Sequence, residues 1–137
     1  MMEFVVLEWE KTSYKNLSNM EDCYFYTLSR GPTLLYIGIA YFQDVQSEVK
    51  NTIRDFDLNI HGLTIWLGYI EETSYKRITE QIIKDVECLL IFTHQPPYNT
   101  HCTSSYTGRN NLKVENQGCP YLKPCVKVER GYIYDEC

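Results

Sequence analysis

The first 40 residues alternate between short apolar runs and polar connections, a pattern typical of β-strands joined by turns. The run from Phe4 to Trp9 is rich in Val and aromatic residues and predicts a strand, whereas the polar run from Lys11 to Asp22 predicts a loop. Two further strand-like runs, Cys23–Leu28 and Thr33–Ile39, flank the turn-forming sequence Ser29-Arg-Gly-Pro32. The pattern therefore predicts a β-hairpin.

The next segment has the spacing of an amphipathic α-helix, with apolar residues at every fourth position and polar residues one position behind them. The apolar positions are Val45, Val49 and Ile53, and the polar ones are Gln46, Lys50 and Arg54. Asp44 is a suitable cap, so a helix that ends near Asp55 is expected. Its polar edge brings Gln46, Lys50 and Arg54 close together.

A third core strand and a second helix follow. Leu63–Ile70 alternates and is rich in β-branched and aromatic residues, which predicts a strand. After Ser74 the apolar residues again recur on one side of a helix, until Pro96-Pro97 stops the pattern. This predicts a helix from about Tyr75 to His94.

The last part of the chain is polar and turn-rich before it returns to short strand-like runs. These runs are Leu112–Glu115 and Val126–Tyr134, the second with a bend at Gly131. The length of 137 residues fits one domain. We therefore expect a single α/β (α+β) domain over residues 1–137, with a small mixed or antiparallel central sheet flanked by helices.

Composition narrows the class of protein. The chain is 44% hydrophobic and 23% charged, which is typical of a folded globular domain. The apolar run at Phe4–Leu7 is too short for a membrane span or a signal-peptide core, so we expect a cytoplasmic protein without membrane contact. Because 13 basic residues face 18 acidic ones, any nucleic acid would have to meet a local cluster of cations.

The six cysteines are even in number, but without a secretory signal we expect reduced thiols. Cys119 and Cys125 are separated by five residues, whereas zinc knuckles usually have two to four. A structural zinc ion at the C-terminal cysteines is therefore the less favoured interpretation, and buried or idle thiols are favoured.

Four polar residues are placed where they could carry chemistry. Tyr26 and Tyr36 lie on the two strands of the predicted hairpin, Glu87 directly follows the apolar Val86 of the second helix, and Asn99 comes just after that helix. Each is ordinary by itself, because aromatic residues suit pleated surfaces and a Glu beside an apolar stripe is usually solvated.

Together these residues resemble the GIY-YIG nuclease family of excision-repair incision subunits and homing endonucleases. Tyr24-Phe-Tyr26 stands where the family has its first tripeptide, and Tyr36-Ile-Gly38 matches the second. The two motif tyrosines are ten residues apart. Val86-Glu-Cys-Leu-Leu-Ile91, with Asn99 twelve residues after Glu87, is similar to the family's metal-binding segment. The resemblance covers residues 23–99, and residues 100–137 form an extension beyond it.

The resemblance implies hydrolysis of phosphodiester bonds at a single divalent ion. Glu87 would be the ligand of one Mg²⁺ or Mn²⁺. Tyr26 would contact or deprotonate the attacking water, and Tyr36 would position water and phosphate. Asn99 would orient Glu87 or a phosphate oxygen. A phenol with an ordinary pKa of about 10 needs cationic neighbours to act as a base at neutral pH.

The chain departs from the family where that positive charge is expected. The family's active-site arginine corresponds to Gln46, its next helical position to Lys50, and the residue after the second tripeptide, commonly Lys, is Ile39. A guanidinium gives bidentate charge stabilisation that an amide does not. Because Lys50 and Arg54 share the helix face of Gln46, either could supply the lost cation from another position.

Two functions remain open at this stage. The first is a metal-dependent endonuclease that acts on DNA, or on RNA, and that would cut both strands as a homodimer. The second is a catalytically impaired domain that binds nucleic acid or a protein partner without cleavage. The residues expected against a nucleic-acid backbone are Gly38, Lys50, Arg54 and Arg109.

Overall fold

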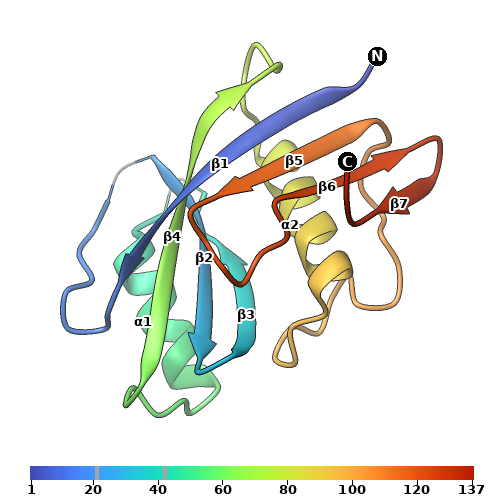
Figure 1. The fold of residues 1–137 in the computed structure, drawn as a ribbon. Helices are drawn as coiled ribbons and strands as arrows, with labels where there is room; N and C mark the ends of the chain where they lie inside the picture. Colours follow the sequence, from blue (N-terminus) through green and yellow to red (C-terminus); the bar gives the residue numbers. More distant parts are fainter. Residues whose placement is uncertain (21, 42) are drawn as a thin grey trace.

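The computed structural model describes residues 1–20, 22–41 and 43–137, which form a mixed α/β fold (Figure 1). The strands are β1 (Glu3–Thr12), β2 (Cys23–Arg30), β3 (Thr33–Ile39), β4 (Leu63–Thr73), β5 (Leu112–Gln117), β6 (Cys125–Glu129) and β7 (Tyr132–Tyr134). The helices are α1 (Val45–Asp55) and α2 (Glu80–His94). The predicted hairpin, first helix and third core strand are confirmed.

All seven strands of the described residues belong to one sheet, in the order β3-β2-β4-β1-β5-β6-β7. Only β1 and β5 are parallel, and the other neighbouring pairs are antiparallel. Helix α2 contacts both β3, at one edge, and β6, near the other edge. The sheet therefore curls around α2, which lies beside β3 and behind β5 and β6 in Figure 1.

The two faces of the sheet build two hydrophobic cores, because successive side chains of a strand point to opposite faces. Phe25 and Ile37 pack in one core with α2 and the strands β1, β5 and β6. Tyr26 and Leu28 pack in the other core with the buried face of α1. This buried face consists of Val45, Val49 and Ile53, as the helical spacing predicts. Helices α2 and α1 thus contribute to different hydrophobic cores.

Helix α2 begins later than the sequence pattern predicts, because the residues around position 74 are used to close the sheet. The Ser74 N–H donates to Phe4 O at 3.1 Å, and the Tyr75 N–H donates to the Thr73 hydroxyl at 3.1 Å. Thr79 is the actual cap, and its hydroxyl accepts from the Ile82 N–H at 3.3 Å. The predicted start at Tyr75 is therefore five residues too early, whereas the end at His94 is confirmed.

Four of the six cysteines form disulfides, so the expectation of reduced thiols is wrong for them. Cys88 in α2 is bonded to Cys102, and Cys125 in β6 is bonded to Cys137. Cys23 and Cys119 are buried free thiols. Disulfides thus take three of the four C-terminal cysteines, and Cys119 alone is left as a thiol for the zinc ion considered there. Among the described residues, neither helix is long and apolar enough to cross a membrane.

His94 joins the end of α2 to the connection between β5 and β6. Its Nδ1–H donates to Leu90 O at 2.8 Å, and its Nε2 accepts from the Lys123 N–H at 2.8 Å. This arrangement needs the neutral ring, because Nε2 must accept. Burial accordingly lowers the pKa of His94. His94 therefore has a structural role, because it links the end of α2 to the segment before β6.

The lowered pKa of His94 predicts a loss of stability in mild acid. In the unfolded chain His94 takes up a proton near its ordinary pKa of about 6.5, whereas in the folded chain it resists protonation. Below that pH the unfolded state binds more protons, so the free energy of unfolding falls as pH decreases. Urea unfolding at pH 7.5 and 5.5 should show a smaller fall for His94→Gln than for wild type. The exposed His61→Gln variant should match wild type, and equal falls in all three would contradict the assignment.

Candidate active site

Glu87 lies on the side of α2 that approaches the edge strand β3, and it is only 6% exposed. Its neighbours Val86 and Cys88 are also buried, so this stretch of α2 lies in the interior of the protein. Glu87 Oε1 accepts a hydrogen bond from His101 Nε2 at 3.2 Å. Burial raises the pKa of Glu87, while the hydrogen bond and charge of His101 and the charge of Lys84 partly lower it. The positive charge near Glu87 therefore does not offset the cost of burying its ionised carboxylate.

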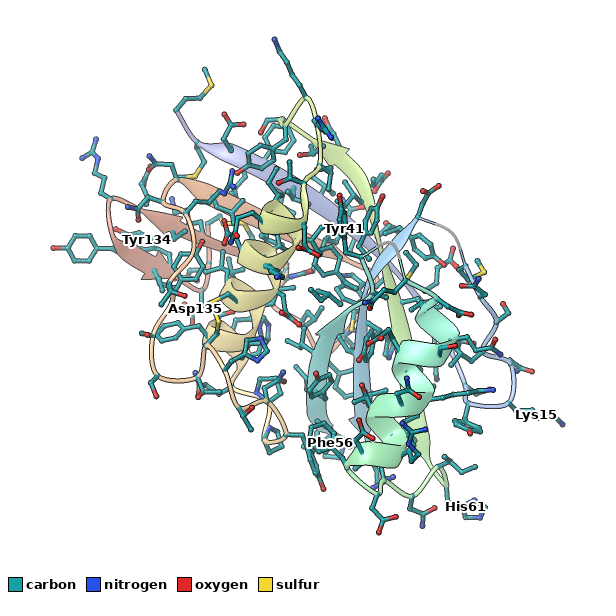
Figure 2. All side chains as sticks on the ribbon, turned by 180° about the vertical axis from the view of Figure 1, so that it is seen from behind. Lys15, Tyr41, Phe56, His61, Tyr134 and Asp135 are labelled. Carbon is teal, nitrogen blue, oxygen red and sulfur yellow. A yellow bond between two sulfur atoms is a disulfide. The ribbon has the colours of Figure 1, made fainter. Side chains whose placement is uncertain are left out.

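Tyr36 projects from β3 next to this carboxylate. Burial is the main reason that the pKa of Tyr36 is raised, and the negative charge of Glu87 is the second. Its ring lies 6.0 Å from that of Tyr26 and 5.4 Å from that of Phe56, centroid to centroid. Phe56 lies at the C-terminal end of α1 (Figure 2). Tyr36 therefore lies between the ring of Tyr26 and the charge of Glu87.

Tyr26 is almost fully enclosed, with 1% of its surface exposed. Its phenol oxygen is 2.7 Å from the hydroxyl of Thr52 on α1. Burial raises the pKa of Tyr26 strongly, and the charges of nearby acidic groups, including Glu87, raise it further. Tyr26 therefore remains protonated, and it is poorly suited to deprotonate a water molecule.

Gly38 gives Tyr26 the space that its ring occupies. A Cβ atom at position 38 would lie 2.4 Å from Cζ of Tyr26, far inside van der Waals contact. Gly38 is buried beneath this ring, so the expected contact between Gly38 and a nucleic-acid backbone is not available. The glycine of the second tripeptide has a packing function in this fold.

Asn99 fastens the segment after α2 to the outer edge of β3. Its Oδ1 accepts from the Ile37 N–H at 3.0 Å, and its Nδ2 donates to Ile37 O at 2.9 Å. Both amide atoms are used, so the side chain does not turn to Glu87 or to a phosphate. Asn99 instead holds in place the strand that carries Tyr36 and Gly38.

Asn99→Ala is therefore expected to lower the free energy of unfolding by about 2 to 3 kcal/mol, because two buried backbone groups lose their partner. The exposed Asn51→Ala variant on α1 should be neutral or slightly stabilising, since Ala favours helices. Urea unfolding measures both. A loss of activity with unchanged stability in Asn99→Ala would instead indicate a direct role in chemistry.

The polar residues of α1 and Arg109, which the sequence placed at the site, contact other parts of the protein instead. Gln46 Nε2 donates to Leu17 O at 2.9 Å, and Lys50 Nζ lies 5.3 Å from the centre of the Tyr14 ring. Arg54 is exposed and pairs with Asp55 at 3.5 Å. Arg109 donates from Nε to the buried Asp85 at 2.7 Å, which ties its loop to α2. Arg54 is the one of these side chains that solvent reaches most freely, with 72% exposure.

A pocket of about 310 Å³ opens beside Glu87. Its lining includes Ile39 from β3, Lys84, Asp85 and Glu87 from α2, and His101 and Cys102 from the following segment. Lys84 and His101 are the two residues that lower the pKa of Glu87. The spacing of Lys84, three residues before Glu87 on one helix face, is the signal in the sequence that points to it.

The donor atoms at this pocket suit a divalent ion bound by few protein ligands. The described ranges 1–20, 22–41 and 43–137 contain no group of three or more His, Cys, Asp and Glu side chains arranged for a metal. A single carboxylate is nevertheless sufficient where water and substrate phosphate complete the shell. Glu87 fits this arrangement, because its carboxylate is buried and lacks a full countercharge.

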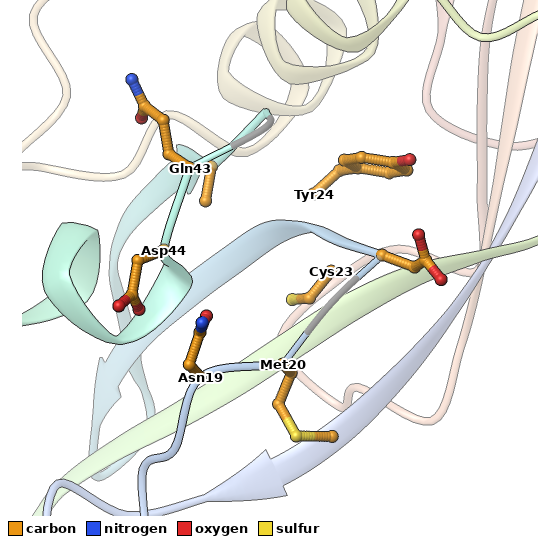
Figure 3. A pocket seen from close by; sticks show the side chains of 8 residues that line it. Asn19, Met20, Cys23, Tyr24, Gln43 and Asp44 are labelled. Atoms are coloured by element: carbon orange, nitrogen blue, oxygen red, sulfur yellow. The ribbon is translucent and has the colours of Figure 1, made fainter.

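A second pocket, of about 340 Å³, lies between the start of β2 and the start of α1 (Figure 3). Asn19, Met20, Cys23, Tyr24, Gln43 and Asp44 are among its lining residues. Burial raises the pKa of the Cys23 thiol to about 12, so the thiolate that a nucleophile or a metal ligand requires is unfavourable there. The described lining residues give this pocket no thiolate, and none of them lines the pocket beside Glu87.

Comparison with known proteins adds no relative to this description. No protein-family model, no curated protein and no solved structure matched the chain.

Proposed function

We propose that the chain is a metal-dependent endonuclease of the GIY-YIG type that hydrolyses phosphodiester bonds in DNA. The observation that carries the proposal is the buried Glu87 carboxylate, which opens on a pocket and lies next to Tyr36 and Tyr26. The curled sheet with a helix on each face is compatible with that fold family. Mg²⁺ or Mn²⁺ is the proposed cofactor, with Glu87 as its ligand.

When bound at Glu87, the ion would supply Lewis acidity toward the phosphate and its leaving 3′ oxygen. The residues of the chain supply orientation. Tyr36 is the less buried phenol, and it can donate a hydrogen bond to water or phosphate. Tyr26 keeps its proton and supports the ring of Tyr36. Lys84 adds positive charge beside the pocket, a role that the sequence suggested for Lys50.

The proposed partner is the backbone of DNA, with RNA as the alternative substrate. The net charge of −5 means that binding depends on local cations, of which Arg54 and Lys84 are exposed. A second copy of the chain would be required to cut both strands at one place. A cytoplasmic location stays a prediction, and the two disulfides stand against it because such bonds are rare in that compartment.

Nicking of supercoiled plasmid tests this function. The purified full-length chain should convert supercoiled DNA to open circles with Mn²⁺ or Mg²⁺, and EDTA should stop the reaction. Incubation of a single-stranded RNA with the chain and the same ions tests the alternative substrate. Failure to cleave either nucleic acid with any divalent ion would contradict the proposed activity.

A binding domain without cleavage is the second candidate. Gln46 favours it, because its amide is bonded to Leu17 O and supplies no charge at the position of the family's arginine. Fluorescence anisotropy with a labelled DNA duplex separates the two functions. Binding without nicking would identify a binding domain, whereas binding with nicking would identify the endonuclease.

A further inference from the structure

We infer that His101 is a second ligand of the divalent ion, so that Glu87 and His101 form a two-residue site for a first-row transition ion such as Mn²⁺ or Zn²⁺. The inference rests on the proposed function, because it concerns the same pocket. It gives a metal-binding role to His101, which lies outside the motif region. It also shifts the expected ion from Mg²⁺ toward Mn²⁺ or Zn²⁺.

The distance between the two donor atoms supports this assignment. Glu87 Oε1 and His101 Nε2 are 3.2 Å apart. Two ligands that are each about 2.1 Å from one ion are separated by roughly 3.0 Å at a right angle and roughly 3.4 Å at a tetrahedral angle. The observed separation lies between these values. The pair can therefore hold one ion once His101 Nε2 gives up its proton and its hydrogen bond to Glu87, and the ring turns so that the Nε2 lone pair faces the ion.

The burial of the pair is also typical of an open metal site. The Glu87 side chain is 8% exposed, whereas that of His101 is 56% exposed. An ion would therefore enter from the His101 side and keep positions open toward the pocket for water or phosphate. The positive charge of Lys84 opposes such an ion only weakly, because the Lys84 side chain is 54% exposed and its ammonium lies 3.6 Å from Glu80.

A covalent bond holds the two ligands next to each other. Each of them is followed directly by a cysteine, and Cys88 and Cys102 form a disulfide with a Cα–Cα distance of 5.3 Å. The bond therefore fixes the backbone of the His101 segment against α2 at the level of Glu87. A thiol reductant would convert the bond to two thiols, with formation of the oxidised reductant, and would release the His101 segment.

The chemistry of the donors decides which ion is preferred. Mg²⁺ favours oxygen ligands and retains its water, whereas an imidazole nitrogen suits transition ions. A Glu and a His together are thus better matched to Mn²⁺ or Zn²⁺ than to Mg²⁺. We expect affinities in the order Zn²⁺, Mn²⁺, Mg²⁺, from tightest to weakest.

Isothermal titration of the full-length oxidised chain with Mn²⁺ tests the inference without a need for activity. Mn²⁺ is the main probe because it is also the ion used in the nicking assay. Wild type should bind one ion, and His101→Ala should weaken binding by about 10- to 100-fold or more. The exposed His61→Ala variant is the matched control and should bind as wild type does. The Cys88→Ser/Cys102→Ser variant should also bind more weakly, by about tenfold.

The outcomes separate the inference from the proposed function. If His101→Ala binds Mn²⁺ as tightly as wild type while Glu87→Gln does not bind it, His101 is not a ligand and the endonuclease proposal survives. If wild type binds no divalent ion, both proposals are contradicted. Because His101 is the hydrogen-bond partner of the buried Glu87, thermal unfolding of the metal-free His101→Ala chain is measured alongside, and a variant that is still folded at the titration temperature excludes a loss of binding through misfolding.

Discussion

Replacement of Glu87 by Gln is expected to slow metal-dependent nicking by about 1,000-fold, equivalent to about 4 kcal/mol of transition-state stabilisation. Gln has nearly the same shape, and its amide oxygen can still accept from His101, so the pocket should keep its form. What disappears is the negative charge that would hold the ion. The rate of plasmid nicking under single-turnover conditions with Mn²⁺ measures the effect.

The same substitution should not weaken the fold, and this distinguishes a functional residue from a structural one. Burial raises the pKa of Glu87, so its ionised form is unfavourable in the folded chain near neutral pH. Removal of that charge should leave the free energy of unfolding unchanged or increase it. Glu72→Gln, at an exposed position of β4, is the control and should change neither property. Nicking at the wild-type rate by Glu87→Gln would exclude the carboxylate as the essential ligand.

Gly38→Ala is expected to lower the free energy of unfolding by about 3 kcal/mol, at the upper end of the usual cost of overpacking a core. The added Cβ would lie within 2.4 to 2.8 Å of three atoms of the Tyr26 ring. Tyr26 cannot easily move, because its hydroxyl is bonded to Thr52 and its ring lies in the core beneath α1. Urea unfolding of the variant measures the cost.

Two controls identify the cause of this loss. Gly31→Ala introduces a Cβ into open space at a φ of +55°, so it should cost only the backbone strain of about 1 kcal/mol. In a Tyr26→Leu background, Gly38→Ala should cost less, because the ring that it would strike is absent. An equal cost of Gly38→Ala in both backgrounds would show that the clash with Tyr26 is not the cause.

The parts of the fold that depend on local pattern could be predicted from the sequence. The spacing of Val45, Val49 and Ile53 indicated the buried face of α1, and the turn at Gly31 and Pro32 indicated the hairpin. These features follow from periodicity and turn chemistry within about ten residues of chain. The later start of α2 could not be predicted, because it depends on a backbone hydrogen bond from Ser74 to Phe4, 70 residues away in sequence.

The resemblance to the GIY-YIG family implied that Tyr26, Tyr36 and Glu87 lie together. In the structure the Tyr26 and Tyr36 rings are neighbours, and the charge of Glu87 acts on Tyr36. The partners of Asn99 and Gln46 could not be predicted, because these side chains hydrogen-bond to backbone groups that are 62 and 29 residues away in sequence. Cysteine spacing likewise gives no pairing, so the bond that brings Cys102 to Cys88 came only from the three-dimensional arrangement.

Anomalous scattering from crystals soaked in Mn²⁺ tests the central claim most directly, because it locates the ion independently of activity. The account predicts one strong peak within about 2.2 Å of a Glu87 carboxylate oxygen, in the pocket that Glu87 and His101 line. Peaks only at exposed carboxylates such as Glu72 or Asp55, with none at Glu87, would contradict it.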